Sequence, residues 1–170
     1  MPVTEESLIL TKKAVNQKIR RMAYEIYENN FGDKVIVLAG IYDRGYELAQ
    51  KIKKELEKIS SLEVRLVKIT IDKEKPLKEE AALDCQYADL KGKSVIVIDD
   101  VLNTGRTMAH SFKAFLKAEI KKMEAAALVD RSHKLYPINA TYKGYELSTT
   151  LNEHVEVRLK GEAQGVYLLG

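Results

Sequence analysis

The sequence predicts an α/β fold with a mostly parallel, twisted sheet, helices on both faces of that sheet and a small C-terminal β flap. Continuous apolar runs at residues 35–40 and 95–98 are typical of strands that are buried on both faces, residues 124–129 indicate another buried strand, and residues 63–71, rich in Val, Leu and Ile, indicate a further strand. Segments with helical periodicity separate several of these runs. Right-handed crossovers between parallel strands would place those helices on both faces of the sheet.

The composition is that of one soluble globular domain, which we expect to span residues 1–170. The chain is 45% hydrophobic and 31% charged, with a formal net charge of +3. This mild positive charge favours anionic ligands without demanding nucleic acid. Cys85 is the only cysteine, which excludes an intrachain disulfide and fits a reducing cytoplasm. No apolar run has the length of a membrane span and no signal peptide is evident, so we expect a cytoplasmic protein without a membrane partner.

The first helix is expected to follow a short strand or extended arm at residues 4–10. Thr11 can cap this helix, and residues 29–32 end it. Its apolar residues recur at helical spacing: Val15, Ile19, Met22 and Ile26. Its outer face is basic, through Lys12, Lys13, Lys18, Arg20 and Arg21. We favour a solvated helix face over a nucleic-acid patch as the interpretation of these charges.

The remaining elements are less regular. A second helix is expected to have an apolar face that runs from Leu48 to Ile59. Residues 72–92 form a long polar stretch, and a loop of this length in a compact domain is usually functional or mobile. Beyond residue 136, short strands are expected around residues 141–142, 155–159 and 166–169. We expect them to form an antiparallel flap or an edge added to the main sheet.

The stretch from Val95 to Thr107 carries the clearest chemistry. A buried strand leads into two adjacent carboxylates, Asp99 and Asp100, and then into a loop with Gly105 that opens a helix. Such a loop binds anions, because backbone N–H groups point out of the first helical turn and the helix dipole favours negative charge there. The two carboxylates suit ribose hydroxyls or a hydrated Mg²⁺. The implied ligand is a sugar phosphate; the alternative is an ordinary strand–loop–helix with acidic residues near a cap.

A second strand–loop–helix follows residues 35–40, and its loop contains Arg44 and Gly45. An arginine followed by glycine at this position can hold another anionic group. Both loops then fall at the carboxyl edge of the sheet, where open α/β sheets bind their ligands. Polar residues that begin at Asp130 end the strand at 124–129 and point into the same crevice.

These motifs resemble those of a known family. The acids Asp99 and Asp100, followed by Thr104-Gly105-Arg106-Thr107, are similar to the PRPP-binding motif of type I phosphoribosyltransferases. The motif is neither a P-loop nor a dinucleotide fingerprint. Residues 38–49 and 128–133 resemble segments of the PyrR family, whose members are bifunctional uracil phosphoribosyltransferases and RNA-binding regulators of pyrimidine operons. The resemblance covers most of the chain.

The resemblance implies a Mg²⁺-dependent enzyme that transfers phosphoribose from PRPP to a nucleobase, uracil in this branch, and releases pyrophosphate. It implies that Asp99 and Asp100 are catalytic and reach the metal through water. The residues implied for the 5′-phosphate are Asn103, Thr104, Gly105, Arg106 and Thr107, and those for pyrophosphate are Tyr42, Asp43, Arg44 and Gly45. The residues implied for the base are Val129, Asp130 and Arg131. Asp130 could equally well fix the local turn.

The sequence departs from the family in the long loop. The family carries a Tyr-Arg-Asp-Asp run after the strand, where this chain has Ile71-Asp72-Lys73-Glu74-Lys75. Lys73 or Lys75 would then supply the missing cation, and residues 72–92 would form a flexible lid over PRPP.

The alternative function is a PRPP- or nucleotide-sensing, RNA-binding regulator of pyrimidine genes with weak or no catalysis, in which Lys134 and the first helix contact RNA. The expected partners are PRPP and a nucleobase, with RNA as a possible third, and we expect a homodimer or a higher homo-oligomer. A metal site at His133 and His154 is disfavoured by their spacing.

Overall fold

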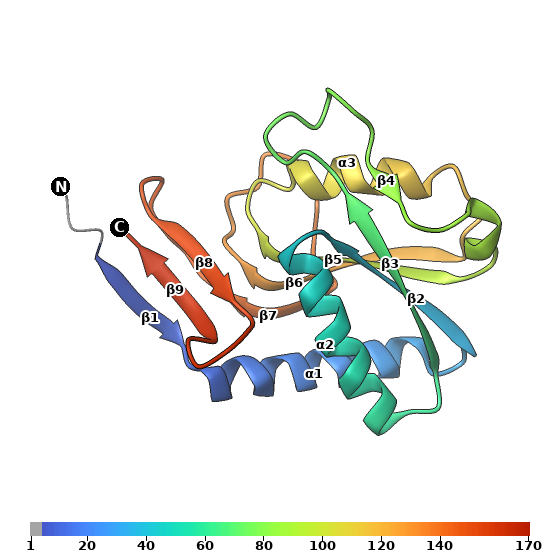
Figure 1. The fold of residues 1–170 in the computed structure, drawn as a ribbon, viewed down its shortest axis with the longest axis horizontal. Coiled ribbons are helices and arrows are strands. Elements are labelled where there is room, and N and C mark those ends of the chain that lie inside the picture. The colour runs from blue at the N-terminus through green and yellow to red at the C-terminus, as the bar shows by residue number, and fades with distance from the viewer. Residues whose placement is uncertain (1–4) are drawn as a thin grey trace.

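The computed structural model describes residues 5–170, which form two sheets and the helices that cover them (Figure 1). Residues 1–4, which belong to the expected domain and whose last member begins the expected N-terminal arm, lie outside this range. The main sheet has the strand order β4-β3-β2-β5-β6-β7. Its parallel strands are β2 (Val35–Ile41), β3 (Glu63–Thr70), β5 (Ser94–Leu102), β6 (Lys122–Asp130) and β7 (Tyr142–Glu146). The short strand β4 (Ala82–Leu83) pairs antiparallel with β3.

Helices cover both faces of the main sheet, as predicted. Figure 1 shows α1 (Lys12–Asn30) and α2 (Arg44–Ile59) below the sheet and α3 (Arg106–Phe115) above it. Alternate residues of β5 serve the two layers, because successive side chains of a strand point to opposite faces. Ile96 packs in the core with α1 and α2, whereas Val97 packs in the core with α3.

The first helix begins where the sequence predicts. Thr11 is the N-cap, and its hydroxyl accepts a hydrogen bond from the Ala14 amide at 3.1 Å. The helix ends at Asn30, within the predicted stop at residues 29–32. No described helix combines the length and the apolar character that a bilayer span requires.

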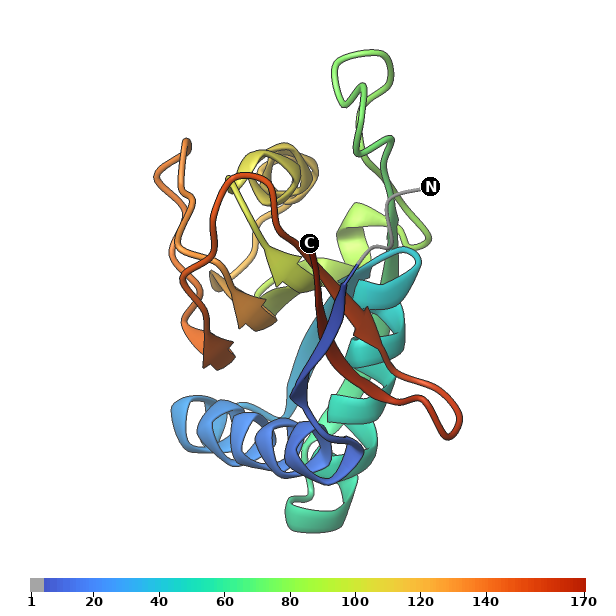
Figure 2. The same ribbon diagram turned by 90° about the vertical axis from the view of Figure 1, so that its left-hand side faces the viewer.

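The C-terminal strands divide between the two sheets. The sequence predicts an antiparallel flap or an added edge, and the structure contains both. β7 extends the main sheet as a parallel edge strand. β8 (His154–Arg158) and β9 (Gly165–Leu169) instead join β1 (Glu6–Leu10) in a small antiparallel sheet of order β1-β9-β8. Figure 2 shows β1 and the C-terminal hairpin side by side. This pairing joins segments far apart in the sequence, which local pattern does not reveal.

The long loop at residues 72–92 is polar but not devoid of structure. It contains β4 and a 3₁₀ turn, η1 (Tyr87–Leu90). Glu80 ties the loop to α3 and to the turn that follows it, through ion pairs with Lys113 at 2.9 Å and Lys117 at 2.6 Å. Both lysines lower the pKa of Glu80, to about 2. The flexible-lid role of this loop stays a prediction.

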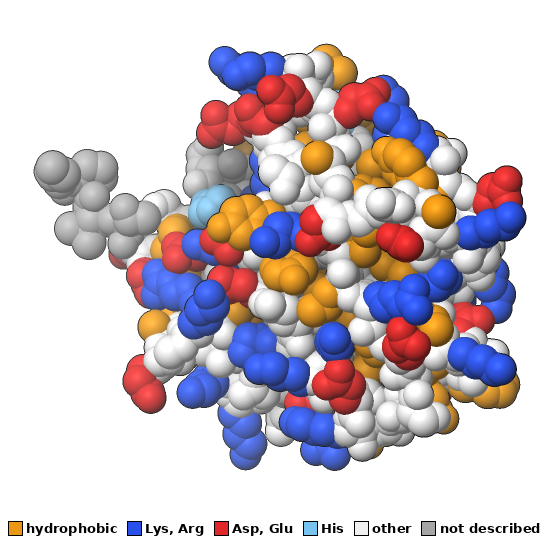
Figure 3. Space-filling model, turned by 45° about the vertical axis from the view of Figure 1, so that its right-hand side comes forward, with side chains coloured by type: hydrophobic (Ala, Val, Ile, Leu, Met, Phe, Trp, Pro, Cys, Tyr) orange, Lys and Arg blue, Asp and Glu red, His pale blue; other side chains and the backbone are white. Residues whose placement is uncertain are grey.

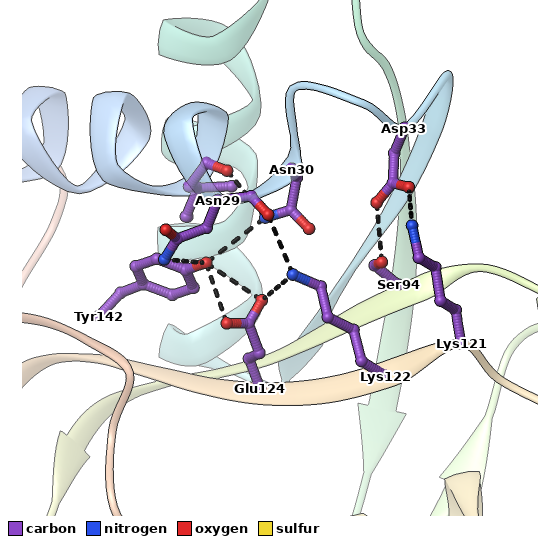
Figure 4. A network of polar contacts seen from close by, with 9 residues as sticks. Asn29, Asn30, Asp33, Ser94, Lys121, Lys122, Glu124 and Tyr142 are labelled. Carbon is purple, nitrogen blue, oxygen red and sulfur yellow. Dashed lines mark hydrogen bonds and ion pairs between the residues drawn. The ribbon is translucent and has the colours of Figure 1, made fainter.

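A polar network closes the end of the sheet where β6 and β7 begin (Figure 4). The hydroxyl of Tyr142, on β7, donates to the Glu124 carboxylate at 3.1 Å and accepts from the Asn29 amide at 3.1 Å. Burial raises the pKa of Tyr142 to about 12, so the hydroxyl keeps its proton. Lys122 pairs with Glu124 at 3.2 Å and donates to the Asn29 carbonyl. The network joins the end of α1 to β6 and β7, at the end of the sheet opposite the predicted ligand site.

Candidate active site

A cavity of about 600 Å³ opens at the carboxyl ends of β2 and β5. Its walls come from four parts of the chain: the loop after β2, the end of β5 with the start of α3, one residue beyond β3, and the start of β8. The lining residues are Tyr42, Asp43 and Arg44, residues 99–108, Lys73, and His154 with Val155. The structure therefore brings the predicted acid pair, the predicted 5′-phosphate residues and most of the predicted pyrophosphate residues into one cavity.

The acid pair lies at the end of β5 and is nearly buried. Asp99 is 5% exposed and Asp100 is 7% exposed. Lys73 donates to both carboxylate oxygens of Asp99, at 3.1 and 3.2 Å. Burial and the neighbouring Asp100 raise the pKa of Asp99, and Lys73 offsets only part of this effect. The pair therefore holds more negative charge than its surroundings compensate, which favours a bound cation or hydroxyl donors.

The phosphate loop, residues 103–107, turns sharply from β5 into α3. Gly105 has a φ of +88°, in the left-handed region that favours glycine. A Cβ at this position would lie 3.0 Å from Cγ1 of Ile138, a tight contact that would require the Ile138 side chain to shift. The Thr104 carbonyl accepts hydrogen bonds from the amides of Leu135 at 2.9 Å and Tyr136 at 3.0 Å. The segment that follows β6 thus holds the phosphate loop in place, and the first turn of α3 lies at the cavity.

The pyrophosphate loop, residues 42–45, lies beside the acid pair. It contains a cis peptide between Tyr42 and Asp43. Gly45 lies behind the cavity wall, where a Cβ would come within 2.5 Å of the Ile98 carbonyl oxygen. Only glycine allows the loop to approach β5 this closely. Arg44 borders the cavity, and its guanidinium lies 3.9 Å from the Glu156 carboxylate on β8.

The three predicted base-binding residues lie at the end of β6 and do not line this cavity. Val129 is fully buried. The Asp130 carboxylate accepts from the Ser132 amide at 3.0 Å and pairs with Lys134. These contacts are those of the local turn, which is the second role that the sequence left open for Asp130. A contact between this segment and the base remains a prediction.

Two cavity residues were missed as substrate contacts by sequence reasoning. His154 and Val155 begin β8, and they reach the cavity because the small sheet places this strand against the end of β5. No local motif marks them. The structure also separates the two candidate cations of the long loop, because Lys73 lines the cavity and Lys75 does not.

Residues 7–161 match the family described as the phosphoribosyl transferase domain. The chain belongs to this family. It is 36% identical over 160 residues to the bifunctional protein PyrR of Clostridium kluyveri, a match that covers 91% of this chain and 90% of that protein. It is 37% identical over 162 residues to the bifunctional protein PyrR of Clostridium beijerinckii, with 91% of each chain covered. The resemblance to PyrR-like type I phosphoribosyltransferases is thereby confirmed.

Solved structures confirm the predicted fold. The hypoxanthine phosphoribosyltransferase of Trypanosoma cruzi superimposes with a TM-score of 0.75 at 16% identity, over 88% of this chain and 84% of that one. A hypoxanthine-guanine phosphoribosyltransferase of Bacillus anthracis gives a TM-score of 0.71 at 17% identity, over 86% and 84% of the two chains. At these identities the likeness concerns the fold alone.

The acid pair fits Mg²⁺ that is held mainly through water. Among residues 5–170, no three His, Cys, Asp or Glu side chains gather into a group that could enclose a metal ion. Mg²⁺ keeps several waters and is commonly held by one or two carboxylates together with substrate phosphates. Asp99 and Asp100, side by side on the cavity wall, offer that kind of partial coordination.

Replacing Gly105 by Ala should weaken PRPP binding by about tenfold or more, a loss of about 1.4 kcal/mol per factor of ten. The new Cβ would push against Ile138 and displace the phosphate loop. Gly92→Ala is the matched control, because Gly92 also has a positive φ, +70°, but open space around it. Both variants should lose about 1–2 kcal/mol of stability to backbone strain. Titration calorimetry with PRPP separates them, and equal affinities would contradict the role of the close packing.

Replacing Asp99 by Asn should stabilise the ligand-free protein at neutral pH and abolish tight PRPP binding. The folded-state pKa of Asp99 is raised, so stability falls as the pH rises from the unfolded-state value near 3.8 to the folded-state pKa, and the cost is fully present above that pKa. The gain in melting temperature should be a few degrees at pH 7, at about 2–4 °C per kcal/mol, and should shrink towards pH 4. Thermal unfolding measured between pH 4 and pH 7 checks this change in melting temperature. Substitution of the exposed Glu162 by Gln is the control. A variant less stable than the parent at pH 7 would argue against the raised pKa.

Proposed function

We propose that this chain catalyses the Mg²⁺-dependent transfer of the phosphoribosyl group from PRPP to uracil, giving UMP and pyrophosphate. The observation that carries the proposal is the meeting of the acid pair with the phosphate and pyrophosphate loops in one cavity. Membership of the family implies PRPP and a base as substrates. Uracil is the finer assignment, supported by the similarity to PyrR proteins.

The cavity residues have distinct tasks in this reaction. The phosphate loop orients the 5′-phosphate through the first-turn amides of α3 and the Thr104 and Thr107 hydroxyls. Asp99 and Asp100 accept hydrogen bonds from the ribose hydroxyls and stabilise the positive charge that develops at the anomeric carbon. Arg44 and the pyrophosphate loop receive the leaving group. The acid pair would hold Mg²⁺ through water, and the ion's contribution is to neutralise the departing pyrophosphate.

An assay of pyrophosphate release with PRPP, Mg²⁺ and a panel of nucleobases tests the proposal. Uracil should support turnover and yield UMP. Removal of divalent ions with EDTA should abolish turnover, and added Mg²⁺ should restore it. No turnover with any common nucleobase would refute the catalytic assignment and favour a PRPP- or nucleotide-sensing regulator.

Lys73→Gln should lower kcat by about 10–100-fold and change PRPP affinity less, because the contact to pyrophosphate strengthens as the bond breaks. The Lys73 side chain is 42% exposed, so it can leave Asp99 and follow the leaving group. Lys75→Gln is the matched control, since this lysine is two residues away and outside the cavity lining. Steady-state rates of UMP formation give kcat and the KM for PRPP. Equal effects of the two substitutions would contradict a specific role for Lys73.

A second activity, RNA binding, is favoured by the surface that α1 and α2 share. A groove of about 900 Å³ lies between these helices. Its basic and aromatic lining residues are Lys12, Lys13, Arg20, Tyr24 and Lys58. Burial is the main cause that lowers the pKa of Lys51, and the neighbouring charges of Lys54, Lys12 and Lys160 add to this effect while Glu47 opposes it. Figure 3 shows Lys and Arg side chains over the lower part of the molecule, where Figure 1 places these helices.

The groove supports RNA binding beyond what the sequence suggested. The first helix alone favoured a solvated face, whereas the structure adds lysines of α2 to the same surface. The related PyrR proteins are named bifunctional. We therefore propose that this surface contacts the phosphate backbone of a structured RNA.

Replacing Lys12 and Lys58 together by Gln should weaken binding of an RNA hairpin by about tenfold and reduce the slope of log K against log salt by about 1.5, since each lost phosphate contact removes roughly 0.7–0.9. Lys91→Gln with Lys93→Gln is the charge-matched control away from the groove. Fluorescence anisotropy over a salt series measures both. An unchanged slope of log K against log salt in the Lys12/Lys58 variant would show that RNA does not bind at this groove.

We further propose that the protein acts in the cytoplasm as a homodimer or a higher homo-oligomer. The half-buried free thiol of Cys85 suits a reducing compartment. Light scattering of the purified protein tests the oligomeric state.

A further inference from the structure

Arg131 makes more side-chain hydrogen bonds than the turn that carries it requires. It follows β6 directly and is only 8% exposed. Its Nε and Nη2 donate to the Thr149 hydroxyl at 3.0 and 2.6 Å, and Nη2 also donates to the Glu153 carbonyl at 2.7 Å. Its Nη1 points the other way and donates to the Asn103 side-chain oxygen at 3.1 Å.

These contacts join one wall of the cavity to the segment that leads into another wall. Asn103 begins the phosphate loop. Thr149 and Glu153 belong to the segment of residues 147–153, which ends immediately before His154 at the start of β8. The Arg131 amide also donates to the Leu102 carbonyl at 3.0 Å, so backbone and side chain hold the same turn of the phosphate loop.

Arg131 forms no ion pair with a described carboxylate, and its charge is compensated only in part by Glu153, whose pKa is lowered first by hydrogen bonds from Thr150 and also by the Arg131 charge. Its acceptors are a hydroxyl, an amide oxygen and backbone carbonyls, and no described carboxylate lies within 4.0 Å of its guanidinium. A buried charge without a counter-ion costs free energy, and a planar guanidinium with five donors can engage several acceptors in fixed directions. An anion bound next to Asn103 would compensate this charge in part.

We propose that Arg131 is a positioning residue of the active site, which locks the phosphate loop to the segment that leads into β8. The role is separate from base binding, which the sequence suggested for this residue. Because the guanidinium contacts both the phosphate loop and the segment before β8, loss of Arg131 should make both of them more mobile. The part of the proposal that concerns PRPP affinity rests on the proposed function.

Hydrogen exchange of the ligand-free protein tests the lock without any assumption about substrate. In Arg131→Gln, amides of residues 103–107 and of residues 147–154 should both exchange at least about tenfold faster, the factor for 1.4 kcal/mol of lost opening free energy. Faster exchange confined to residues 147–154 would overturn the proposal. Arg21→Gln is the matched control, because Arg21 also donates to two backbone carbonyls, those of Lys143 and Gly144, but none of its partners lines the cavity.

PRPP affinity provides the functional readout. Arg131→Gln should weaken PRPP binding by about 10–100-fold, the range for a hydrogen bond to a charged group, whereas Arg21→Gln should not. Arg131→Lys keeps the charge but loses the fork, and it should restore little of the affinity. In a cycle with Asn103→Ala, the two effects should be less than additive, because both substitutions break the same bond.

The outcomes separate the two hypotheses. Unchanged affinity in a folded Arg131→Gln variant, or full additivity in the cycle, would overturn the positioning role. A parent protein that binds no PRPP would refute the proposed function. The exchange data would still show whether Arg131 holds the phosphate loop to the segment before β8. If Arg131→Gln does not fold, Thr149→Val removes the acceptor of two Arg131 bonds, and the same pattern should appear in smaller measure. Exchange unchanged at residues 103–107 in that variant would count against the proposal.

Discussion

Two neighbouring carboxylates at the end of β5, buried and only partly neutralised, are the constraint that orders the rest of the active site. Burying Asp99 and Asp100 is unfavourable unless opposite charge or donors are close. The parallel sheet supplies them by converging several strand ends on one edge. Lys73, from beyond β3, contacts Asp99 directly, while Arg44 at the start of α2 and Arg106 at the start of α3 line the same cavity. The cavity is therefore a basic rim around an acidic wall, which suits a polyanion that also carries hydroxyl groups.

The two ends of the sheet have different kinds of polar structure. Around Tyr142, hydrogen bonds among hydroxyl, amide and carboxylate groups join α1 to β6 and β7, with the buried Asn30 Oδ1 left without a partner. At the carboxyl end, the acid pair lacks full compensation and backbone turns depend on glycines that touch neighbouring chain segments. Cross-linking polar contacts lie at one end of the sheet, and the candidate ligand site lies at the other. Such a division allows the site to hold strained and charged groups without loss of the fold.

Local sequence was sufficient for features that lie within one short segment. The acid pair and the phosphate loop occupy residues 99–107, so their proximity in the fold follows from their proximity in the sequence. The role of Arg131 was not predictable in this way, because its partners Asn103 and Thr149 lie 28 and 18 residues away in the sequence. His154 was not predicted as a cavity residue for a similar reason, since its position depends on pairing between strands that are far apart in the sequence. For Lys73 and Lys75, the irregular loop offered no periodicity from which to infer which side chain turns inward.

The small sheet has a consequence for how the protein is made. Its register pairs Glu6 with Leu169, so β1 finds its partner only after almost all of the chain described here has left the ribosome. The same sheet carries His154 to the cavity. Contacts of such large sequence separation are slow to form, because a long loop must close first. During synthesis, the nascent chain would hold both anion-binding loops before the wall at β8 exists, and ligand arriving early would meet an open, half-built site.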